Sequence, residues 1–238
     1  MSQESVAIEY VDAAIASLRR YDLLRQPDPN MPTEMRDTNG SKMDDWVPWQ
    51  PIASTVTDGD ISELQSRFRG PLPAPYVAFL KHRHFYELDG CGVRFEDHVV
   101  GRWKKRLIDL YDTYRLRFPN GSHLIPFGRE TFMDAGPACF DFQKRRSNGD
   151  CPVVFWDHEW VSTDREVRLL FSSSERMFRC LAFAARSDID FVYSDPNEDS
   201  EEELAKKGRL LAQFLELDPE GAGGPGREYW TSWGVTLS

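Results

Sequence analysis

The densest group of chemically capable side chains in this chain is Asp157-His158-Glu159, which directly follows the apolar run of residues 153–156. An imidazole beside carboxylates can exchange protons or ligate a metal ion, so these residues are candidates for a hydrolase active site. Side chains alternate between the two faces of a β-strand, so Asp157 and Glu159 would share one side and His158 the other. One acid–base pair is then possible. The three side chains could ligate a metal ion from one face only if the strand ends at this point. We therefore favour a partner-binding edge, with catalysis or metal binding as the alternative.

Two tryptophans flank this cluster and favour the same interpretation. Trp156 precedes the three residues and Trp160 follows them. Aromatic side chains dominate the energetics of many protein–protein interfaces because they fill well-packed pockets from which water is excluded. Trp160 is the tryptophan that we most expect to contact a partner.

Three other patterns could suggest a metal or a cofactor, but each lacks a required feature. His82 and His84 are two residues apart, and residues two apart on a helix do not face each other. Residues 221–226 match G-x-G-x-x-G by letter, without the preceding strand and following helix that dinucleotide binding needs. Residues 195–206 begin like a calcium loop but lack its central glycine and its final glutamate. The sequence therefore predicts no metal and no cofactor.

The charge of the chain narrows the classes of partner. The formal net charge is −10 over 238 residues, with 40% hydrophobic residues, and the pI is about 5.0. A general nucleic-acid binder needs a basic surface to neutralise phosphates, so this class is disfavoured. An acidic protein attracts a basic partner electrostatically. The hydrophobic fraction is sufficient for a sizeable core.

The start of the chain and its cysteines bear on the compartment. The first residues are polar and acidic, unlike a signal peptide, and no run approaches the roughly 18 apolar residues that a bilayer-spanning helix needs. The four cysteines are far apart and form no C-x-x-C, so reduced, buried thiols are expected. We expect a cytoplasmic protein without membrane or nucleic-acid partners. The sequence leaves its oligomeric state open.

Hydrophobic periodicity and turn residues predict helices on both sides of a run of strands. A helix is expected over residues 5–24, with a linker or surface loop at 26–46. Thr57 and Asp60 fit a capping box that opens a second helix. Further helices are predicted from Pro75, over 102–117, after the serines at 172–174, and over a segment with Leu204, Leu211, Phe214 and Leu215 on one face. Strands are predicted at 124–127, 138–142, 152–157 and 167–171, with a strand-like piece at 189–193. This order indicates an α+β fold with a mainly antiparallel sheet flanked by helices.

An ordered set of short motifs runs through residues 46–186. They are Trp49 with Pro51-Ile52, residues 56–61, residues 70–73 with Tyr76 and Phe79-Leu80, and then residues 125–128, 139–141 and 152–159. In this order and spacing the chain resembles the SUKH superfamily, a group of bacterial toxin-immunity proteins and fungal cell-wall assembly regulators of the Smi/Knr type. The chain departs from the family pattern at residues 81–84, where we expect an Asn-Gly-like turn, and in the length of the 102–117 helix.

The resemblance implies a non-enzymatic α+β module that binds another protein, often a basic nuclease toxin that it neutralises by direct capture. Strand pairing of the family type would also place Asp134 and Asp141 on the face of the acidic cluster. The predicted partner-binding residues are therefore Asp134, Asp141, Trp156, Asp157, His158, Glu159 and Trp160. The alternatives are a regulatory scaffold, like the fungal members, and the hydrolase that would use Asp157, His158 and Glu159.

We also predict a division of the chain into three parts. Residues 1–45 would form an N-terminal helix and linker, residues 46–186 the SUKH-like domain, and residues 187–238 a C-terminal extension that packs on the domain.

Overall fold

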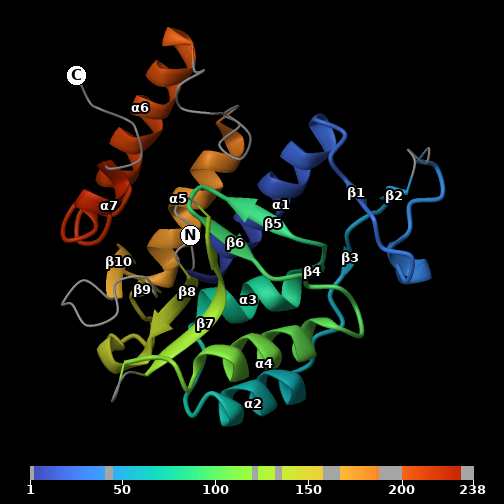
Figure 1. The fold of residues 1–238 in the computed structure, drawn as a ribbon, viewed down its shortest axis with the longest axis horizontal. Helices are drawn as coiled ribbons and strands as arrows, with labels where there is room; N and C mark the ends of the chain where they lie inside the picture. Colours follow the sequence, from blue (N-terminus) through green and yellow to red (C-terminus); the bar gives the residue numbers. More distant parts are fainter. Residues whose placement is uncertain are drawn as a thin grey trace.

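The fold is α+β and is built around one antiparallel sheet, as the order of elements predicts. A computed structural model describes residues 3–40, 45–119, 123–131, 136–157, 167–187 and 200–231. The main sheet has six strands in the order β10-β9-β8-β7-β6-β5, so β10 and β5 are its edges (Figure 1). Its strands are β5 (Leu88–Gly90), β6 (Val93–Phe95), β7 (Leu124–Glu130), β8 (Pro137–Asp141), β9 (Val153–Trp156) and β10 (Val167–Phe171). The four strands predicted between residues 124 and 171 are thereby confirmed.

Two short strand pairs lie beside the main sheet. They are β1 (Arg25–Gln26) with β2 (Val47–Pro48), and β3 (Ile52–Ala53) with β4 (Arg83–His84). The first pair lies within and just after the segment predicted as a linker, which also contains a short 3-10 helix at Thr33–Met35. The predicted strand-like piece at 189–193 lies outside the described residues.

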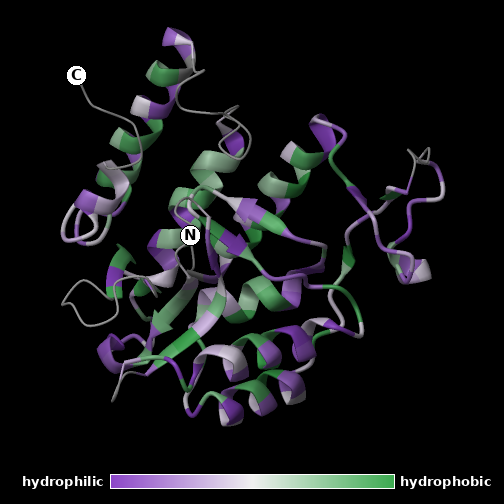
Figure 2. Ribbon diagram, viewed as in Figure 1, coloured by the Kyte–Doolittle hydropathy of each residue, from purple (hydrophilic) through white to green (hydrophobic). Residues whose placement is uncertain are grey.

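The bounds of the helices are α1 (Gln3–Arg20), α2 (Asp58–Arg67), α3 (Ala74–His82), α4 (Trp103–Tyr114), α5 (Ser174–Arg186), α6 (Glu201–Leu217) and α7 (Arg227–Thr231). Helices α1 to α6 follow the predicted segments, whereas α7 directly follows residues 221–226, where no helix was expected. In Figure 2, α2 and α4 alternate between hydrophobic and hydrophilic residues along their length, as amphipathic helices do. Within the described ranges, no helix combines the length and the hydropathy that crossing a membrane requires.

Local capping explains where two of these helices begin. Thr57 Oγ1 accepts a hydrogen bond from the Asp60 amide at 3.1 Å, and the Thr57 amide donates to Asp60 Oδ2 at 2.9 Å. This confirms the predicted capping box, in which both otherwise unpaired amides gain an acceptor. The side chain of Ser173 accepts from the Arg176 amide at 3.1 Å and starts α5 in the same way.

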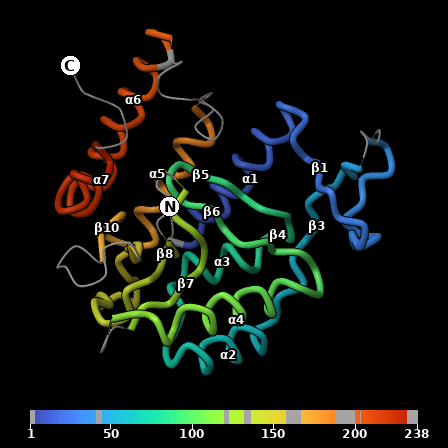
Figure 3. Tube along the Cα trace, in the orientation of Figure 1, coloured from blue at the N-terminus to red at the C-terminus, as the bar shows by residue number. Residues whose placement is uncertain are grey.

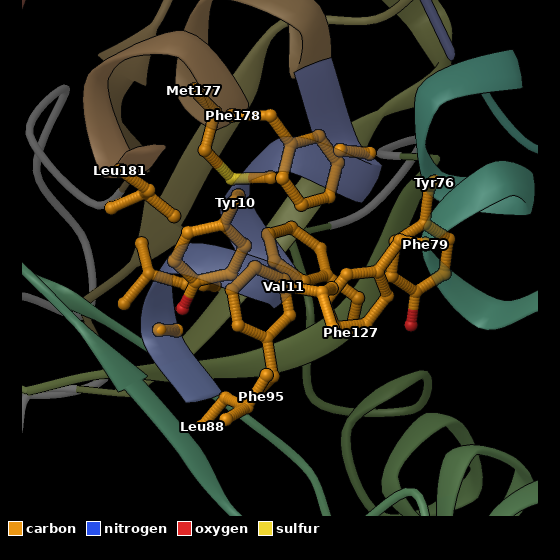
Figure 4. Packing of buried hydrophobic residues seen from close by; sticks show 14 of the residues in the cluster. Tyr10, Val11, Tyr76, Phe79, Leu88, Phe95, Phe127, Met177, Phe178 and Leu181 are labelled. Carbon is orange, nitrogen blue, oxygen red and sulfur yellow. The ribbon is translucent and has the colours of Figure 1, made fainter. Parts of the chain in front are cut away.

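The main core lies between α1, α3 and α5 and one face of the sheet. Phe79 of α3 stacks near Phe95 of β6, with ring centroids 4.5 Å apart, and Tyr10 of α1 lies 5.6 Å from Phe95 and 5.9 Å from Phe178 of α5. Figure 4 shows these rings in one cluster. The N-terminal helix α1 therefore shares its core with α3, α5 and the sheet. Figure 3 shows α1 and α5 side by side although they come from opposite ends of the chain.

The other face of the sheet carries a smaller apolar cluster. Leu124, Cys139, Val154 and Trp156 are buried there, and Tyr114 and Phe118 pack against them from the end of α4 and the segment after it. The Phe118 and Trp156 rings meet edge to face with centroids 5.5 Å apart. Both faces of the central strands are therefore covered.

The C-terminal segment packs against the edge strand β10. Phe214 of α6 and Trp230 of α7 are buried, and their rings lie 6.1 Å and 5.0 Å from that of Phe171. The predicted apolar face of α6 is right at Leu211 and Phe214 but wrong at Leu204, which is 40% exposed. Figure 1 shows why, because the first turns of α6 project beyond the rest of the molecule.

Candidate functional site

Asp157 is the one residue of the Asp157-His158-Glu159 cluster that the structure describes. It directly follows β9 and is buried, with 1% of its side chain exposed. Its Oδ2 lies 3.5 Å from a guanidinium nitrogen of Arg168 on β10, and Arg168 in turn lies over the Phe155 ring at 5.7 Å. A buried carboxylate beside a guanidinium is a paired charge, as burial in a low-dielectric interior requires.

Trp156 and Asp141 are also buried. Trp156 is part of the smaller apolar cluster, with 4% of its surface exposed. Asp141 ends β8 and is 4% exposed. Its Oδ1 accepts from the Gln143 amide at 3.1 Å, and its Oδ2 lies 3.3 Å from Nζ of Lys144. Asp141 thus caps the 3-10 helix Phe142–Lys144, which is a structural role that the sequence did not suggest.

The sheet register separates two of the predicted site residues. Strands β8 and β9 are antiparallel, with Ala138 opposite Phe155 and Phe140 opposite Val153. The end of β8 therefore lies beside the start of β9, so Asp141 and Asp157 stand at opposite ends of the two strands. They also project to opposite faces, since Asp141 shares the side of Cys139 and Asp157 that of Phe155. Asp134, His158, Glu159 and Trp160 lie outside the described residues.

Two further buried aspartates serve as hydrogen-bond hubs that the sequence did not reveal. Asp150 accepts from the amides of Cys151, Ser174 and Glu175 and from the Ser174 hydroxyl, at 2.6–3.1 Å. It therefore caps the N-terminus of α5 from the loop before β9. The serines at 172–174 predicted a cap at the start of this helix. The additional capping carboxylate comes from a different loop, so only the tertiary structure identifies it.

Asp218 ties the C-terminal segment to the end of β10. It accepts from the Ser172 amide at 2.8 Å, from the Ser172 hydroxyl, and from the amides of Gly221 and Ala222 at 3.1 and 3.2 Å. Asp218 is fully buried. The glycine-rich turn that it organises is also tightly packed, since a Cβ on Gly221 would lie 2.1 Å from the Ser172 nitrogen. The glycines within residues 221–226, which resemble a nucleotide-binding motif, are therefore explained by the close packing of this turn.

His84, one of the two histidines weighed for a metal site, forms a buried stacked pair with His98. The His84 and His98 rings lie 4.8 Å apart. The Thr55 amide donates to His84 Nε2 at 3.0 Å, and Nδ1 of each ring contacts a backbone carbonyl at 2.9 Å. Burial, together with His84, lowers the pKa of His98 to about 3, and burial lowers the pKa of His84. Within the described ranges, no three histidine, cysteine or acidic side chains gather as metal ligands.

A cavity of about 500 Å³ lies beside β10, and Arg168, the ion-pair partner of Asp157, is among its wall residues. Its walls include Lys144, Arg146 and Arg168 as well as Glu220 and Glu228. Arg146 is paired with Glu220 at 2.9 Å. With three cations among the described wall residues, this cavity does not have the acidic character that a basic partner would favour.

A second cavity, which we call the edge pocket, lies beside the opposite edge strand β5. It has a volume of about 430 Å³ and is bounded by α1, α5, β5 and the segments around β1 and β2. Apolar wall residues include Leu18 and Leu181, and the polar residues include Tyr10, Trp49 and Asp89. Its lining combines apolar side chains with the charged residues Arg25, Glu87, Asp89 and Arg94.

Three polar atoms on residues that line the edge pocket are inaccessible to solvent and have no hydrogen-bond partner within the described part of the chain. They are Tyr10 Oη, Trp49 Nε1 and Asp89 Oδ1. The second oxygen of Asp89 accepts from Arg94 at 2.6 and 2.9 Å, and Glu87 Oε1 lies 3.2 Å from Arg94. Burial raises the pKa of both Asp89 and Glu87 above their ordinary values, although Arg94 opposes this change. For both carboxylates, burial therefore outweighs the ion pair with Arg94.

Sequence reasoning missed this pocket. Its polar atoms come from α1, from the residue after β2 and from β5, and no spacing in the chain connects them. Three exposed hydrophobic residues, Tyr21, Leu23 and Trp46, are among its lining, but no spacing in the sequence links them. Exposed aromatic residues around a pocket are typical of protein interfaces.

Comparison with known proteins adds one match. The model of the SMI1/KNR4 family (SUKH-1) matches residues 55–180, which run from the β3–α2 connection into α5. The matched segment includes the whole central sheet. A search of curated proteins found no match to this chain.

Proposed function

The chain belongs to the SMI1/KNR4 family (SUKH-1), and on that premise we propose that it is a non-enzymatic protein-binding module. We propose more narrowly that it is an immunity protein, which neutralises a cognate toxin by binding it directly. The family match over residues 55–180 is the observation that carries this proposal, because it covers the whole central sheet.

The charge of the chain supports a basic partner. A formal net charge of −10 favours association with a positively charged domain, and it raises the association rate most at low salt. Nuclease toxins must bind polyanionic substrates and tend to be basic, so they suit this requirement. Capture by an acidic binder would occupy the same surface that such a toxin needs for its substrate.

The position of Asp157 favours binding over hydrolysis. A general acid or base must reach its substrate, whereas Asp157 is 1% exposed and lies beside Arg168. The hydrolase remains a second candidate through His158 and Glu159, and it predicts loss of turnover on His158→Ala. A regulatory scaffold is distinguished from an immunity protein by capture of several partners in place of one.

The proposed partner-binding residues now divide into two groups. Glu159 and Trp160, with Asp134 and His158, stay proposed contacts. Asp141, Trp156 and Asp157 are buried, so we no longer propose them as direct partner contacts. Charge reversal at Asp157 would place a second cation beside Arg168 and would test folding as much as binding.

The direct test is capture of a partner by the tagged full-length chain from native lysate, at low and at moderate salt. We expect one stoichiometric basic protein, retained less at moderate salt. Glu159→Lys should weaken this capture, whereas Glu202→Lys, the same change of charge on an exposed turn of α6, should not. Equal capture by both variants would contradict the assignment of Glu159. Absence of any captured protein at either salt would contradict the proposed function.

A further inference from the structure

A third cavity, which we call the basic cleft, lies where α2 and α4 end beside the start of β7. Its volume is about 450 Å³. Figure 1 shows α2 and α4 side by side at the bottom of the view, and α4 also packs against β7. The lining comes from residues 68–71, from residues between 111 and 118, and from residues 123–125, 142 and 145. All of these segments lie within the part of the chain that matches the family.

Positive charge dominates the lining of the basic cleft. Its described residues include three arginines and one histidine but no aspartate or glutamate, and the arginines are Arg69, Arg115 and Arg145. Arg115 lies 3.0 Å from a carboxylate oxygen of Asp112, but the same carboxylate also binds Arg67 at 2.5 Å. One carboxylate is therefore shared between two guanidinium groups, and the surface around the cleft keeps an excess of positive charge.

The other two arginines of the cleft form no ion pair with a carboxylate in the described part of the chain. The Arg145 guanidinium lies over the Phe142 ring at 4.3 Å and donates to the carbonyl oxygens of Gly149, at 2.7 Å, and Pro71. These neutral acceptors fix the position of the guanidinium without compensating its charge. They use two of its five N–H donors, so the group can still bind an anion.

Arg69 occupies a backbone conformation that glycine usually takes. It follows α2 with a φ of 59°. Its amide donates to the Ser66 carbonyl at 3.3 Å, and the Gly70 amide donates to the Gln65 carbonyl at 3.0 Å. In this arrangement at the end of a helix glycine is preferred, because a Cβ is crowded in the left-handed region. An arginine at this position lowers stability, and residues with such strain cluster at binding and active sites.

The donors of the basic cleft suit a carboxylate better than a phosphate. Proteins commonly hold phosphates with backbone amides at a helix N-terminus or in a glycine-rich loop. Here the amides of Arg69 and Gly70 are bonded within the chain, and that of Leu72 donates to Gln65 Oε1 at 2.9 Å. The donors that remain are guanidinium N–H groups, whose planar fork matches the two oxygens of a carboxylate.

Apolar side chains beside the arginines favour a peptide over a free anion. Leu116 lines the cleft with 82% of its surface exposed, more than any other large hydrophobic residue in the described part of the chain. The Phe118 ring also lines the cleft and is held edge to face against Trp156. A small carboxylate would leave Leu116 in water, whereas an apolar side chain of a peptide would cover it.

We propose that the basic cleft binds an acidic–apolar segment of a partner protein, in which a glutamate or aspartate adjoins a leucine-like residue. The carboxylate accepts from Arg69 and Arg145, and the apolar side chain packs on Leu116. The net charge of the chain is −10, so the average field repels such a segment and the local charge of the cleft attracts it. The inference goes beyond the proposed function, which concerns a basic partner.

The test uses the full chain and the peptide N-acetyl-Leu-Glu-Leu-amide, with the glutamine peptide as its neutral, nearly isosteric control. The readout is the Nε–H signals of Arg69 and Arg145 in a nitrogen–proton correlation spectrum, identified by their loss in Arg69→Gln and Arg145→Gln. We expect a saturable shift with the glutamate peptide and an affinity at least about tenfold weaker for the glutamine peptide. Equal affinities, or no shift with either peptide, would overturn the proposal.

Two further probes test what the cleft recognises besides charge. N-acetyl-Ser-Glu-Ser-amide keeps the carboxylate without the apolar side chains and should bind at least about threefold more weakly than the leucine peptide. Inorganic phosphate should also bind more weakly. Equal affinity of the serine peptide would overturn the contact with Leu116. Tighter binding of phosphate would overturn the assignment to a peptide carboxylate and show a phosphate site.

Arg69→Gly separates recognition from stability, because it removes the cation and introduces the residue that the backbone conformation favours. This variant should melt no lower than the wild type and bind the glutamate peptide at least about tenfold more weakly. Arg145→Gln should weaken binding as well, and its melting temperature verifies that it folds. Arg106→Gln removes a charge from α4 outside the cleft, where the side chain is 55% exposed, and should leave the affinity unchanged. Unchanged affinity in both cleft variants would overturn the assignment.

Sedimentation over a range of protein concentrations tests whether the acidic segment belongs to a second copy of this chain. We expect the sedimentation of the wild type and of Arg69→Gly to be independent of concentration. Self-association of the wild type that is lost in Arg69→Gly would make a second copy the occupant, and would overturn the assignment to a different protein.

Discussion

The two edge strands of the sheet, β10 and β5, are completed in different ways. Along β10 the chain supplies its own partners, since the Trp230 indole donates to the Leu170 carbonyl at 2.9 Å and the Ser172 amide donates to Asp218 at 2.8 Å. Beside β5, the buried atoms Tyr10 Oη and Asp89 Oδ1 have no hydrogen-bond partner among the residues that the structure describes.

This difference teaches how a small α+β protein can divide its two edges between folding and binding. An open strand edge invites uncontrolled pairing, so covering it with the chain's own segment protects the fold. Beside β5 the chain instead exposes the hydrophobic residues Tyr21, Leu23 and Trp46, and exposed aromatic residues around a pocket are typical of protein interfaces. We therefore interpret the β10 edge as structural and the β5 edge as the side available to a partner.

The strongest test of this comparison is the same isosteric change at each edge. Asp218→Asn removes a carboxylate that accepts four hydrogen bonds in the interior, and we expect it to lower the free energy of unfolding by about 3 to 4 kcal/mol. Asp89→Asn should lower it by less than about 1 kcal/mol, because the wild-type carboxylate is buried with one oxygen unsatisfied. Urea unfolding at pH 7 measures both. Equal losses would show that the two edges do not differ in this way.

The pH dependence of unfolding tests the contribution of the buried His98, which belongs to neither edge strand. The pKa of His98 is about 3 in the folded chain, against an ordinary value near 6.5 for an unfolded histidine. Below about pH 6.5 the unfolded chain takes up a proton that the folded chain refuses. The contribution of His98 to the free energy of unfolding is therefore fully present above about pH 6.5 and decreases as the pH falls. At pH 4 the free energy of unfolding is lower by about 3 kcal/mol.

The variant His98→Leu isolates this contribution from that of the carboxylates. Its unfolding free energy should change less than that of the wild type between pH 7 and pH 4. Burial raises the pKa of Asp89 and Glu87, so these groups act in the opposite direction and stabilise the fold as the pH falls through their raised pKa values. Parallel pH profiles for the wild type and the variant would rule out His98 as the source of acid sensitivity.

A pair of glycine substitutions tests how tightly the β10 edge is closed. An alanine at Gly221 would place Cβ 2.1 Å from the Ser172 nitrogen, and we expect a loss of about 2 kcal/mol or more. Gly59 near the start of α2 has open space, with the nearest atom 3.5 Å away, so Gly59→Ala should gain about 0.5 kcal/mol from helix propensity. Thermal unfolding of the two variants gives the comparison, and a tolerated Gly221→Ala would mean that this turn can rearrange.

Tryptophan substitutions at the two edges give the smallest effects. Trp230→Phe removes the hydrogen bond to Leu170 and some buried area, so a loss of about 1 to 2 kcal/mol is expected. Trp46→Ala should change stability by less than about 0.5 kcal/mol, because nearly half of the side chain is exposed. Partner capture should respond in the reverse order, with Trp46→Ala the more damaging variant. If both variants lost partner capture to the same extent, the two edges would not differ in their role in binding.

Much of the fold could be predicted because its signals are local. The capping box at Thr57 and Asp60 depends on residues three apart, and the four central strands are short apolar runs separated by turn residues. The family resemblance was confirmed over residues 55–180. Leu204 was misjudged because periodicity defines the face of a helix but not how far the protein body extends along it.

The candidate site was harder to predict because it depends on register and on distant segments. Asp141 and Asp157 are both acidic residues at strand ends, which suggested one surface. The antiparallel pairing of β8 with β9 sets them at opposite ends. Asp218 bonds to Ser172, 46 positions away, and the walls of the edge pocket come from residues between 10 and 187, so a single sequence carries no spacing signal for either.

The sequence by itself determined the class of fold, the positions of the central strands, the acidic balance and the family. The first three follow from composition or from interactions between residues a few positions apart, and the family follows from the resemblance of ordered motifs along the chain. Only the tertiary structure decided which carboxylates are committed to folding and which remain incompletely compensated. The reason is physical, since a charged group is characterised by the donors, cations and solvent around it, and folding brings these together from remote parts of the chain.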